Sequence, residues 1–365
     1  MIKVFIPCYK RLVSLKWVVI SLFEALHDIE NEAKIFIVNN NPDDQDSVEH
    51  IINDVKINYD NKVDILFIHR EKSLPPAYSW YGAIVENAKE GDIIFIQGDD
   101  DLFLNDGIKY RVESINSSGA DLLISNYIGG LVFSKNDDKV IFDNIDRLKN
   151  TVSKCKFLTL SDSELIGSIF LGNNCYKYNK NFKESLKLAF QWCDQQDWID
   201  ENTRTLFLPF YIPLAAVYLG LKVYYIDKIC VIRGININEV RNSKYGVSNW
   251  NSGFISLLCL GILNNKDLLQ FKELDTQRSL ANKMAATWFL SYYFGQQIDK
   301  RMCLNTFEKI GYPKFNVLLI FQSLKFFINN NLKNLIGIRG YYASKRLKRN
   351  SISAYELLNI LKKFN

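Results

Sequence analysis

Histidine is scarce in this chain of 365 residues, which contains only His27, His50 and His69. So few histidines give poor support to a His-rich zinc site or to a Ser-His-Asp triad. The seven cysteines are scattered and include no Cys-x-x-Cys pair. This pattern argues against a zinc ribbon or a disulfide framework and favours a reducing compartment. Any metal bound here should therefore be a hard cation with oxygen ligands.

A secretory leader is not expected either. The first residues, MIKVFIPCYKR, enter a strand pattern directly, without the charged and apolar regions of a signal peptide. The longest apolar stretch, Leu206–Ile226, is long enough to cross a bilayer, but two prolines and Lys222 interrupt it. Its pattern favours a helix, a turn at Gly220 and then a strand. We therefore expect a cytoplasmic protein.

The net charge of +5 is unevenly distributed. Residues 313–365 carry +9, so residues 1–312 carry −4. The basic run is densest at Tyr341–Asn350. A basic tail suits an anionic surface, which is either nucleic acid or lipid headgroups.

Strand and helix signals alternate along the first 130 residues. The expected strands are Ile2–Pro7, Ile35–Asn39, Val63–His69, Asp92–Ile96 and Asp121–Asn126, and the expected helices are Val13–His27, Val48–Val55, Tyr78–Ala88 and Asn105–Ser117. This alternation predicts an α/β fold with a mostly parallel sheet flanked by helices. Ligands of such sheets bind beyond the carboxyl ends of the strands.

The rest of the chain is less regular. We expect a β-ribbon at Ile128–Ser134 and Val140–Phe142, an extended piece at Ile169–Tyr178, a helix at Phe182–Phe190, and a helix at Leu214–Gly220 before a strand at Val223–Ile226. From about residue 250 only helices are expected, at Gly253–Leu263, Asp275–Tyr293 and Asn316–Asn329. The pattern predicts a sheet domain over residues 1–235, with halves 1–130 and 131–235, and a helical, basic extension over 236–365.

Three consecutive aspartates, Asp99, Asp100 and Asp101, follow the fourth expected strand. Their mutual repulsion and desolvation would be costly without a counter-charge. Mg²⁺ or Mn²⁺, held by one or two carboxylates and by substrate phosphates, would supply that charge and act as a Lewis acid on a departing diphosphate. The alternative is a solvated acidic turn.

Polar residues also follow the first two expected strands. The amides of Asn39 and Asn40 suit hydrogen bonding to a base or ribose, although the segment also reads as a plain Asn-Pro turn. After Pro7, Tyr9 is placed to stack on a base and Arg11 to meet a phosphate. The alternative is an ordinary strand-to-helix turn.

An acidic segment, Asp194-Gln-Gln-Asp197-Trp198, follows the sheet domain's first half. A carboxylate here could act as general base on an acceptor hydroxyl, and Trp198 could pack on a sugar face. A solvated helix start with a capping aspartate is the alternative.

These stretches, in this order, resemble glycosyltransferase family 2, which has the GT-A fold. The resemblance covers about residues 1–235. The family's opening Pro-x-Tyr-Asn-x-Arg is matched by Pro7-Cys-Tyr9-Lys-Arg11 with one residue fewer, and Gly91-Asp92 matches the Gly-Asp before the metal strand. Asn39 and Asn40 stand where the family has two aspartates.

The resemblance also suggests individual roles. In one register of the family's Asp-x-Asp-Asp motif, Gln97 takes the first position and Asp99 and Asp100 the last two. In the other register, Asp99 and Asp101 form the metal-binding pair. Gln196-Asp197-Trp198 is similar to the family's Glu-Asp-Trp motif, so Asp197 inherits the general-base role.

On the acceptor side, the resemblance implies Trp198 and Arg233, the latter at the end of a segment similar to the family's Gly-x-Lys-Ile-x-Tyr. It implies nucleotide contacts from Pro7, Tyr9, Arg11, Asn39, Asn40 and Gln97. The implied halves of the sheet domain are a nucleotide-binding half and an acceptor half.

The implied activity is transfer of a hexosyl or deoxyhexosyl group from a nucleotide-sugar, with Mn²⁺ or Mg²⁺, to a lipid-linked oligosaccharide. Such enzymes build bacterial surface polysaccharide, including the O-antigen of lipopolysaccharide. The basic tail and the apolar residues 315–327 would place the protein peripherally on the cytoplasmic face of the inner membrane.

Two other functions account for less of the sequence. A nucleotidyltransferase would want a Gly-rich phosphate loop after the first strand, and FIPCYKR has no glycine. A non-enzymatic nucleic-acid binder would use the basic tail but would leave the aspartate triplet unexplained. We therefore expect no nucleic-acid partner.

Overall fold

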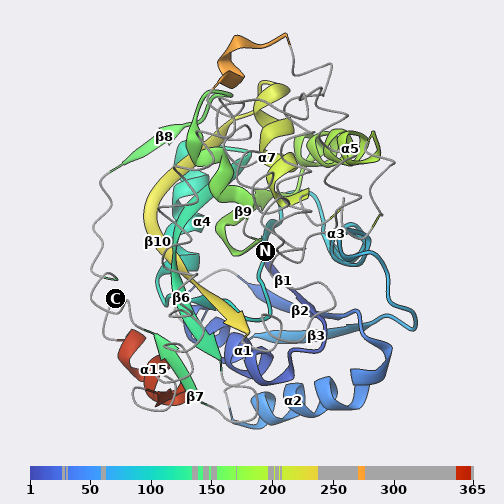
Figure 1. The fold of residues 1–365 in the computed structure, drawn as a ribbon, viewed down its shortest axis with the longest axis vertical. Helices are drawn as coiled ribbons and strands as arrows, with labels where there is room; N and C mark the ends of the chain where they lie inside the picture. The colour runs from blue at the N-terminus through green and yellow to red at the C-terminus, as the bar shows by residue number, and fades with distance from the viewer. Residues whose placement is uncertain are drawn as a thin grey trace, which may run out of the picture.

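The computed structural model describes residues 1–26, 29, 32–58, 63–133, 139–142, 148, 154–169, 171–195, 201, 205, 208–236, 270–275 and 351–362. Within them, one curled sheet runs in the order β11-β7-β6-β9-β4-β1-β2-β3, with β10 pairing with β5, β6 and β8 (Figure 1). The predicted class, a mostly parallel α/β sheet flanked by helices, is confirmed.

Four parallel strands form the first half. They alternate with helices as β1 Ile2–Cys8, α1 Leu12–Leu26, β2 Ala33–Asn39, α2 Gln45–Asn58, β3 Asp64–His69, α3 Pro76–Asn87, β4 Ile93–Ile96 and α4 Gly107–Ser118, with a two-residue strand, β5 Leu102–Phe103, before α4. Every strand and helix predicted before residue 118 is present, with ends that move by only a few residues.

The second half adds longer and mixed strands. Its described elements are β6 Leu122–Phe133, β7 Lys139–Phe142, β8 Cys155–Phe157, β9 Asn174–Lys177, α5 Lys180–Asp194, α7 Leu208–Tyr218, β10 Val223–Asn236, β11 Ile352–Ser353 and α15 Ala354–Leu361. Strand β9 runs antiparallel to both β4 and β6. Strand β10 crosses the second half as a long curved arm beside β6 (Figure 1).

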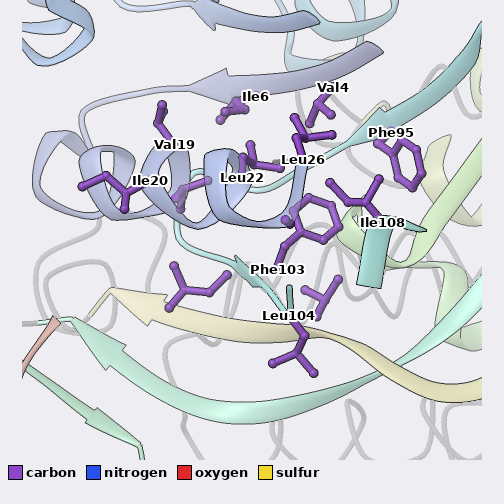
Figure 2. Packing of buried hydrophobic residues seen from close by; sticks show 14 of the residues in the cluster. Val4, Ile6, Val19, Ile20, Leu22, Leu26, Phe95, Phe103, Leu104 and Ile108 are labelled. Carbon is purple, nitrogen blue, oxygen red and sulfur yellow. The ribbon is translucent and has the colours of Figure 1, made fainter. Parts of the chain in front are cut away.

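Alternating side chains of β1 enter two separate cores. Val4 and Ile6 point toward α1, where Val19 and Leu22 pack against them (Figure 2). Phe5 points to the other face and stacks on Phe36 at 4.6 Å between ring centroids. Because β1 is buried on both faces, its sequence is apolar apart from Lys3, whose buried ammonium lies 2.6 Å from Asp92.

The extended piece expected at Ile169–Tyr178 is shorter than predicted. Only β9 is a strand, and two 3-10 helices, Ser163–Ile169 and Leu171–Asn173, precede it. The Ser168 hydroxyl donates to the Leu165 carbonyl, and the Asn174 amide donates to the Ser168 carbonyl. These local side-chain bonds satisfy the backbone in place of a strand ladder.

Residues 208–226 form a helix, a turn and a strand in the predicted order, but the helix begins at Leu208, earlier than the expected Leu214. α7 ends at Tyr218, Gly220 has φ of 76°, and β10 starts at Val223. The helix is wholly buried from Leu208 to Ala216. None of the helices in the described ranges is long and apolar enough to cross a membrane.

The described C-terminal residues return to the sheet. β11 pairs with β7, and Ser353 accepts a hydrogen bond from the Glu356 amide at 3.0 Å to cap α15. Leu357 is buried in the same core as α1, and Lys362 lies 2.8 Å from Glu24 of α1. This stretch is therefore not purely helical, because it supplies one edge strand. The helices expected at Gly253–Leu263, Asp275–Tyr293 and Asn316–Asn329 lie outside the described residues, except Asp275.

Candidate functional site

The site lies at the carboxyl ends of β1, β2 and β4. Strand β4 pairs with β1 only as far as Ile96 opposite Phe5, whereas β2 continues to Asn39 opposite Cys8. The backbone of Gln97 makes one last bond, to the Phe5 carbonyl at 2.9 Å, and then turns away. Pro7, which has no N–H to donate, lies where β4 has already ended. This leaves room beside the β1–α1 loop for the aspartate turn, Gly98–Asp101.

Arg11 holds two of the three aspartates together. Its Nη1 lies 2.7 Å from Oδ1 of Asp99 and 3.1 Å from Oδ2 of Asp100. The Tyr9 amide donates to the other oxygen of Asp99 at 3.2 Å. The side chain of Asp99 is only 6% exposed, whereas that of Arg11 is 24% exposed. The two carboxylates therefore converge on one positive group at the rim of the site.

Asp101 makes different contacts. Its Oδ1 accepts a hydrogen bond from the Gly234 amide of β10 at 3.0 Å, and its carbonyl accepts one from the side-chain amide of Gln97 at 2.7 Å. Arg233, the neighbour of Gly234, places a positive charge near the same carboxylate. Asp101 thus joins the aspartate turn to β10, the strand that carries the predicted acceptor-side arginine.

Two glycines allow this close approach. A methyl group at Gly234 would overlap the carbonyl oxygen of Asp100. A methyl group at Gly172 would lie 2.8 Å from Oε1 of Gln97 and 3.5 Å from Oδ2 of Asp101. Sequence reasoning missed both glycines. For Gly234 the available signal was its place directly after Arg233, and Gly172 gave none.

A buried arginine, also missed, supports the site from behind. Arg111 of α4 is fully buried against the rings of Phe95 and Phe103, each centroid 4.7 Å from its guanidinium carbon. Its Nη1 donates to the Gly172 carbonyl at 2.6 Å. Arg111 follows Ile108 by three residues and so lies on the same apolar side of α4, which indicates that it faces inward. Arg111 fixes the loop that packs against Gln97.

The amides of Asn39 and Asn40 are engaged within the protein. The Asn39 side chain exchanges two 3.0 Å hydrogen bonds with the backbone of Asn41. Asn40 exchanges two with the backbone of Leu74, at 2.8 and 2.9 Å. These bonds shape the loops after β2 and β3, and a direct contact of either amide with a base or ribose stays a prediction.

Tyr9 and Lys10 form the outer part of the β1–α1 loop. Tyr9 is 48% exposed, so its ring presents an open face. Lys10 has φ of 61°, a left-handed conformation that is uncommon for a residue with a side chain. The ammonium of Lys10 lies 5.2 Å from the centre of the Tyr9 ring. This conformation turns the chain sharply between Tyr9 and Arg11, so that both reach Asp99.

Burial governs the acidity of the site. Desolvation raises the pKa of Asp99 to about 7, the charge of Arg11 opposes the rise and that of Asp100 adds to it. Desolvation also raises the pKa of Asp101 to about 7, with Asp100 adding to the rise and the Gly234 amide and Arg233 opposing it. Such carboxyls are poised to release a proton when a cation arrives.

The pKa of Asp101 predicts how its contribution to stability varies with pH. Because the folded-state pKa of about 7 lies above the ordinary 3.8, the folded protein holds more protons between these values. The contribution is therefore largest at low pH and declines as pH rises toward 7. In EDTA, the free energy of unfolding of wild type should rise relative to that of Asp101→Asn as the pH is lowered from about 8 to about 5.5. A difference that is constant over this range would contradict the assignment.

The residues present fit a divalent cation. In the described part of the chain, no three Asp, Glu, His or Cys side chains gather as a complete metal-holding group. Asp99 and Asp100, however, already share one positive group. Oε1 of Gln97 is buried without a hydrogen-bond partner among the described residues, on the side of the turn where Gly172 approaches Asp101. Two carboxylates that leave most positions to substrate oxygens are typical of a magnesium or manganese site.

Two of the predicted residues, Asp197 and Trp198, lie outside the described residues. The chain reaches them from the end of α5, whose start is capped by Asn179 accepting from the Phe182 amide at 2.9 Å. A groove of about 460 Å³ lies between α3 and α5, lined by Val85, Tyr178, Lys183, Leu186, Lys187 and Phe190. None of these residues belongs to the aspartate turn, so the groove does not mark the donor site.

Comparison with known proteins supports the fold. No family model matches the chain, and no curated protein matches it at a significant level. Residues 1–349 of TarS from S. aureus, in complex with UDP-GlcNAc, match with a TM-score of 0.50 and 15% identity over 89% of this chain and 78% of that one. The same part of TarS in another crystal structure gives a TM-score of 0.50 and 14% identity over 85% and 79%.

A mannosyltransferase, PcManGT from Pyrobaculum calidifontis in complex with GDP-Man and Mn²⁺, gives a TM-score of 0.48 and 11% identity over 92% of this chain and 86% of that one. At such low identities the likeness establishes the architecture alone: a curled, mostly parallel sheet flanked by helices.

Proposed function

We propose that the chain is a metal-dependent glycosyltransferase of family 2, using a nucleoside-diphosphate sugar as donor. One observation carries this proposal: Asp99 and Asp100 converge on a positive group at the end of β4. This is the edge of the sheet where ligands of such folds bind. The likeness of the fold to TarS, which was crystallised with UDP-GlcNAc, supports the same class of donor.

Each residue of the site has a role in this proposal. Asp99 and Asp100 would hold Mn²⁺ or Mg²⁺, which when bound supplies Lewis-acid stabilisation of the departing diphosphate. Tyr9, with its exposed ring, would stack on the base. Asp101 would hold β10 in place through Gly234. Arg233 would face the acceptor side.

A nucleotide panel tests the proposal. UDP, GDP, CDP and dTDP would each be titrated calorimetrically into the full chain, with and without Mn²⁺. We expect one of them to bind, and only when the metal is present. Failure of all four under both conditions would contradict the proposal.

Asp197 is proposed as the general base that takes a proton from the acceptor hydroxyl. Asp197→Asn should lower kcat by about a hundredfold or more and leave the affinity for nucleotide and metal unchanged. Asp194→Asn, three residues earlier at the end of α5, is the matched control and should keep its activity. If both variants transfer sugar at the wild-type rate, another group is the base.

The acceptor is proposed to be a lipid-linked oligosaccharide of surface polysaccharide or O-antigen synthesis, reached from the cytoplasmic face of the inner membrane. The basic residues 313–365 support this, because each cation near an anionic surface contributes about 1 kcal/mol. Cell fractionation at low salt should find the protein with membranes and release it at high salt. Recovery in the soluble fraction at low salt would contradict the membrane part of the proposal.

A further inference from the structure

Arg11 lies where a divalent cation would be expected. Its Nη1 lies 2.7 Å from Asp99 and 3.1 Å from Asp100, so one nitrogen bridges the two carboxylates that the proposed function assigns to the metal. Two groups of positive charge cannot share this position without strong repulsion. We propose that Arg11 and the divalent cation compete for Asp99 and Asp100, and that Arg11, once displaced, binds the donor's diphosphate. The inference rests on the proposed function.

The anchoring of Arg11 allows this exchange. Its backbone is fixed, because its carbonyl accepts from the Leu15 amide and the Ser14 hydroxyl, each at 3.1 Å, at the start of α1. Its side chain reaches the carboxylates from the rim and is 24% exposed, whereas Asp99 and Asp100 are 6% and 13% exposed. The guanidinium can therefore turn outward while the two carboxylates stay in place.

The destination of the displaced side chain follows from the geometry and from charge. Arg11 directly precedes α1, and the positive end of a helix dipole favours an anion at that point. A diphosphate held by a metal at Asp99 and Asp100 would lie within reach of the same rim. The planar guanidinium can bind phosphate oxygens in pairs. Arg11 would thus neutralise the carboxylates first and the leaving group later, which couples metal binding to donor binding.

The first test measures Mn²⁺ alone, without nucleotide. Chelator-treated full-length protein would be titrated with MnCl₂ and the free ion followed by electron paramagnetic resonance. Arg11→Gln should bind Mn²⁺ roughly tenfold more tightly than wild type, as expected for removal of one competing charge. Lys10→Asn removes the same charge from the same loop, but Lys10 lies against the Tyr9 ring. This control should bind Mn²⁺ as wild type does.

The second test measures nucleotide affinity, which should fall in the variant whose Mn²⁺ affinity rises. At saturating Mn²⁺, Arg11→Gln should bind the nucleoside diphosphate roughly tenfold more weakly than wild type, because a phosphate partner is lost. Tighter metal binding together with weaker nucleotide binding is the pattern that the exchange predicts. Unchanged or weaker Mn²⁺ binding by Arg11→Gln would overturn the inference and make Arg11 a support of the metal ligands.

Two controls separate the possible failures. If wild type binds metal and nucleotide but Arg11→Gln shows no gain in Mn²⁺ affinity, this inference fails and the proposed function stands. If wild type binds no nucleotide, the proposed function fails first. Should Arg11→Gln not fold, Arg11→Lys gives the comparison, because one ammonium cannot replace the guanidinium fork. It should still gain Mn²⁺ affinity, by a smaller factor, and no gain would again overturn the inference.

Discussion

Asp99→Asn is expected to reduce sugar transfer, measured as kcat/KM, by at least about a hundredfold. Asp99 accepts hydrogen bonds from both the Arg11 guanidinium and the Tyr9 amide, so it connects the β1–α1 loop to the end of β4. Asparagine keeps the size but loses the charge that would attract the cation. The metal-dependent part of nucleotide binding should disappear with the activity, and calorimetry measures it.

The matched control for this variant is Asp43→Asn. Asp43 is an exposed carboxylate in the short 3-10 helix Pro42–Asp44 that follows β2 at the same edge of the sheet. Among the described residues it makes no contact with the aspartate turn, so its removal should leave transfer and nucleotide affinity unchanged. An active Asp99→Asn variant, or an equal loss in both variants, would contradict the role of Asp99.

Gly234→Ala is expected to cause the largest loss of stability, about 3 kcal/mol or more in the free energy of unfolding. The added methyl group would overlap the backbone carbonyl of Asp100, which cannot move aside as the end of a flexible side chain can. It would also separate the Gly234 amide from Asp101. Urea unfolding followed by circular dichroism measures the change.

Gly129→Ala provides the comparison. Gly129 lies on β6 directly beside Arg233 of β10, but a methyl group there meets nothing within 4 Å among the described residues. Its substitution should change the free energy of unfolding by less than about 1 kcal/mol. Equal stabilities for the two alanine variants would mean that β10 does not approach the aspartate turn as closely as described.

The first half of the fold could be predicted because local sequence determines it. The β-rich run Ile2–Pro7 and the helical spacing of Val13–His27 differ in period, and each became the expected element. Segment Ile169–Tyr178 was harder, because its apolar residues suggest a strand while Ser168 and Asn174 bond to nearby carbonyls. The periodicity of apolar residues does not show when local side-chain hydrogen bonds will replace the hydrogen bonds of a strand.

The candidate site was predictable in its carboxylates but not in its contacts. Asp99, Asp100 and Asp101 follow β4, as the sequence predicted, and their role in binding a metal stays a prediction. That Asp101 turns toward Gly234, while the other two meet Arg11, depends on β10 arriving from more than a hundred residues away in sequence. The close approach of Gly172 to Gln97 and the hydrogen bond from Arg111 to the Gly172 carbonyl likewise depend on long-range packing.

The most direct test is diffraction at the manganese absorption edge from crystals grown with Mn²⁺ and the nucleoside diphosphate that binds best. The account predicts one strong anomalous peak, from a manganese ion that is bound by a carboxylate oxygen of Asp99 or Asp100 and by phosphate oxygens. A nucleotide bound without manganese, or a manganese peak with neither aspartate among its ligands, would contradict it.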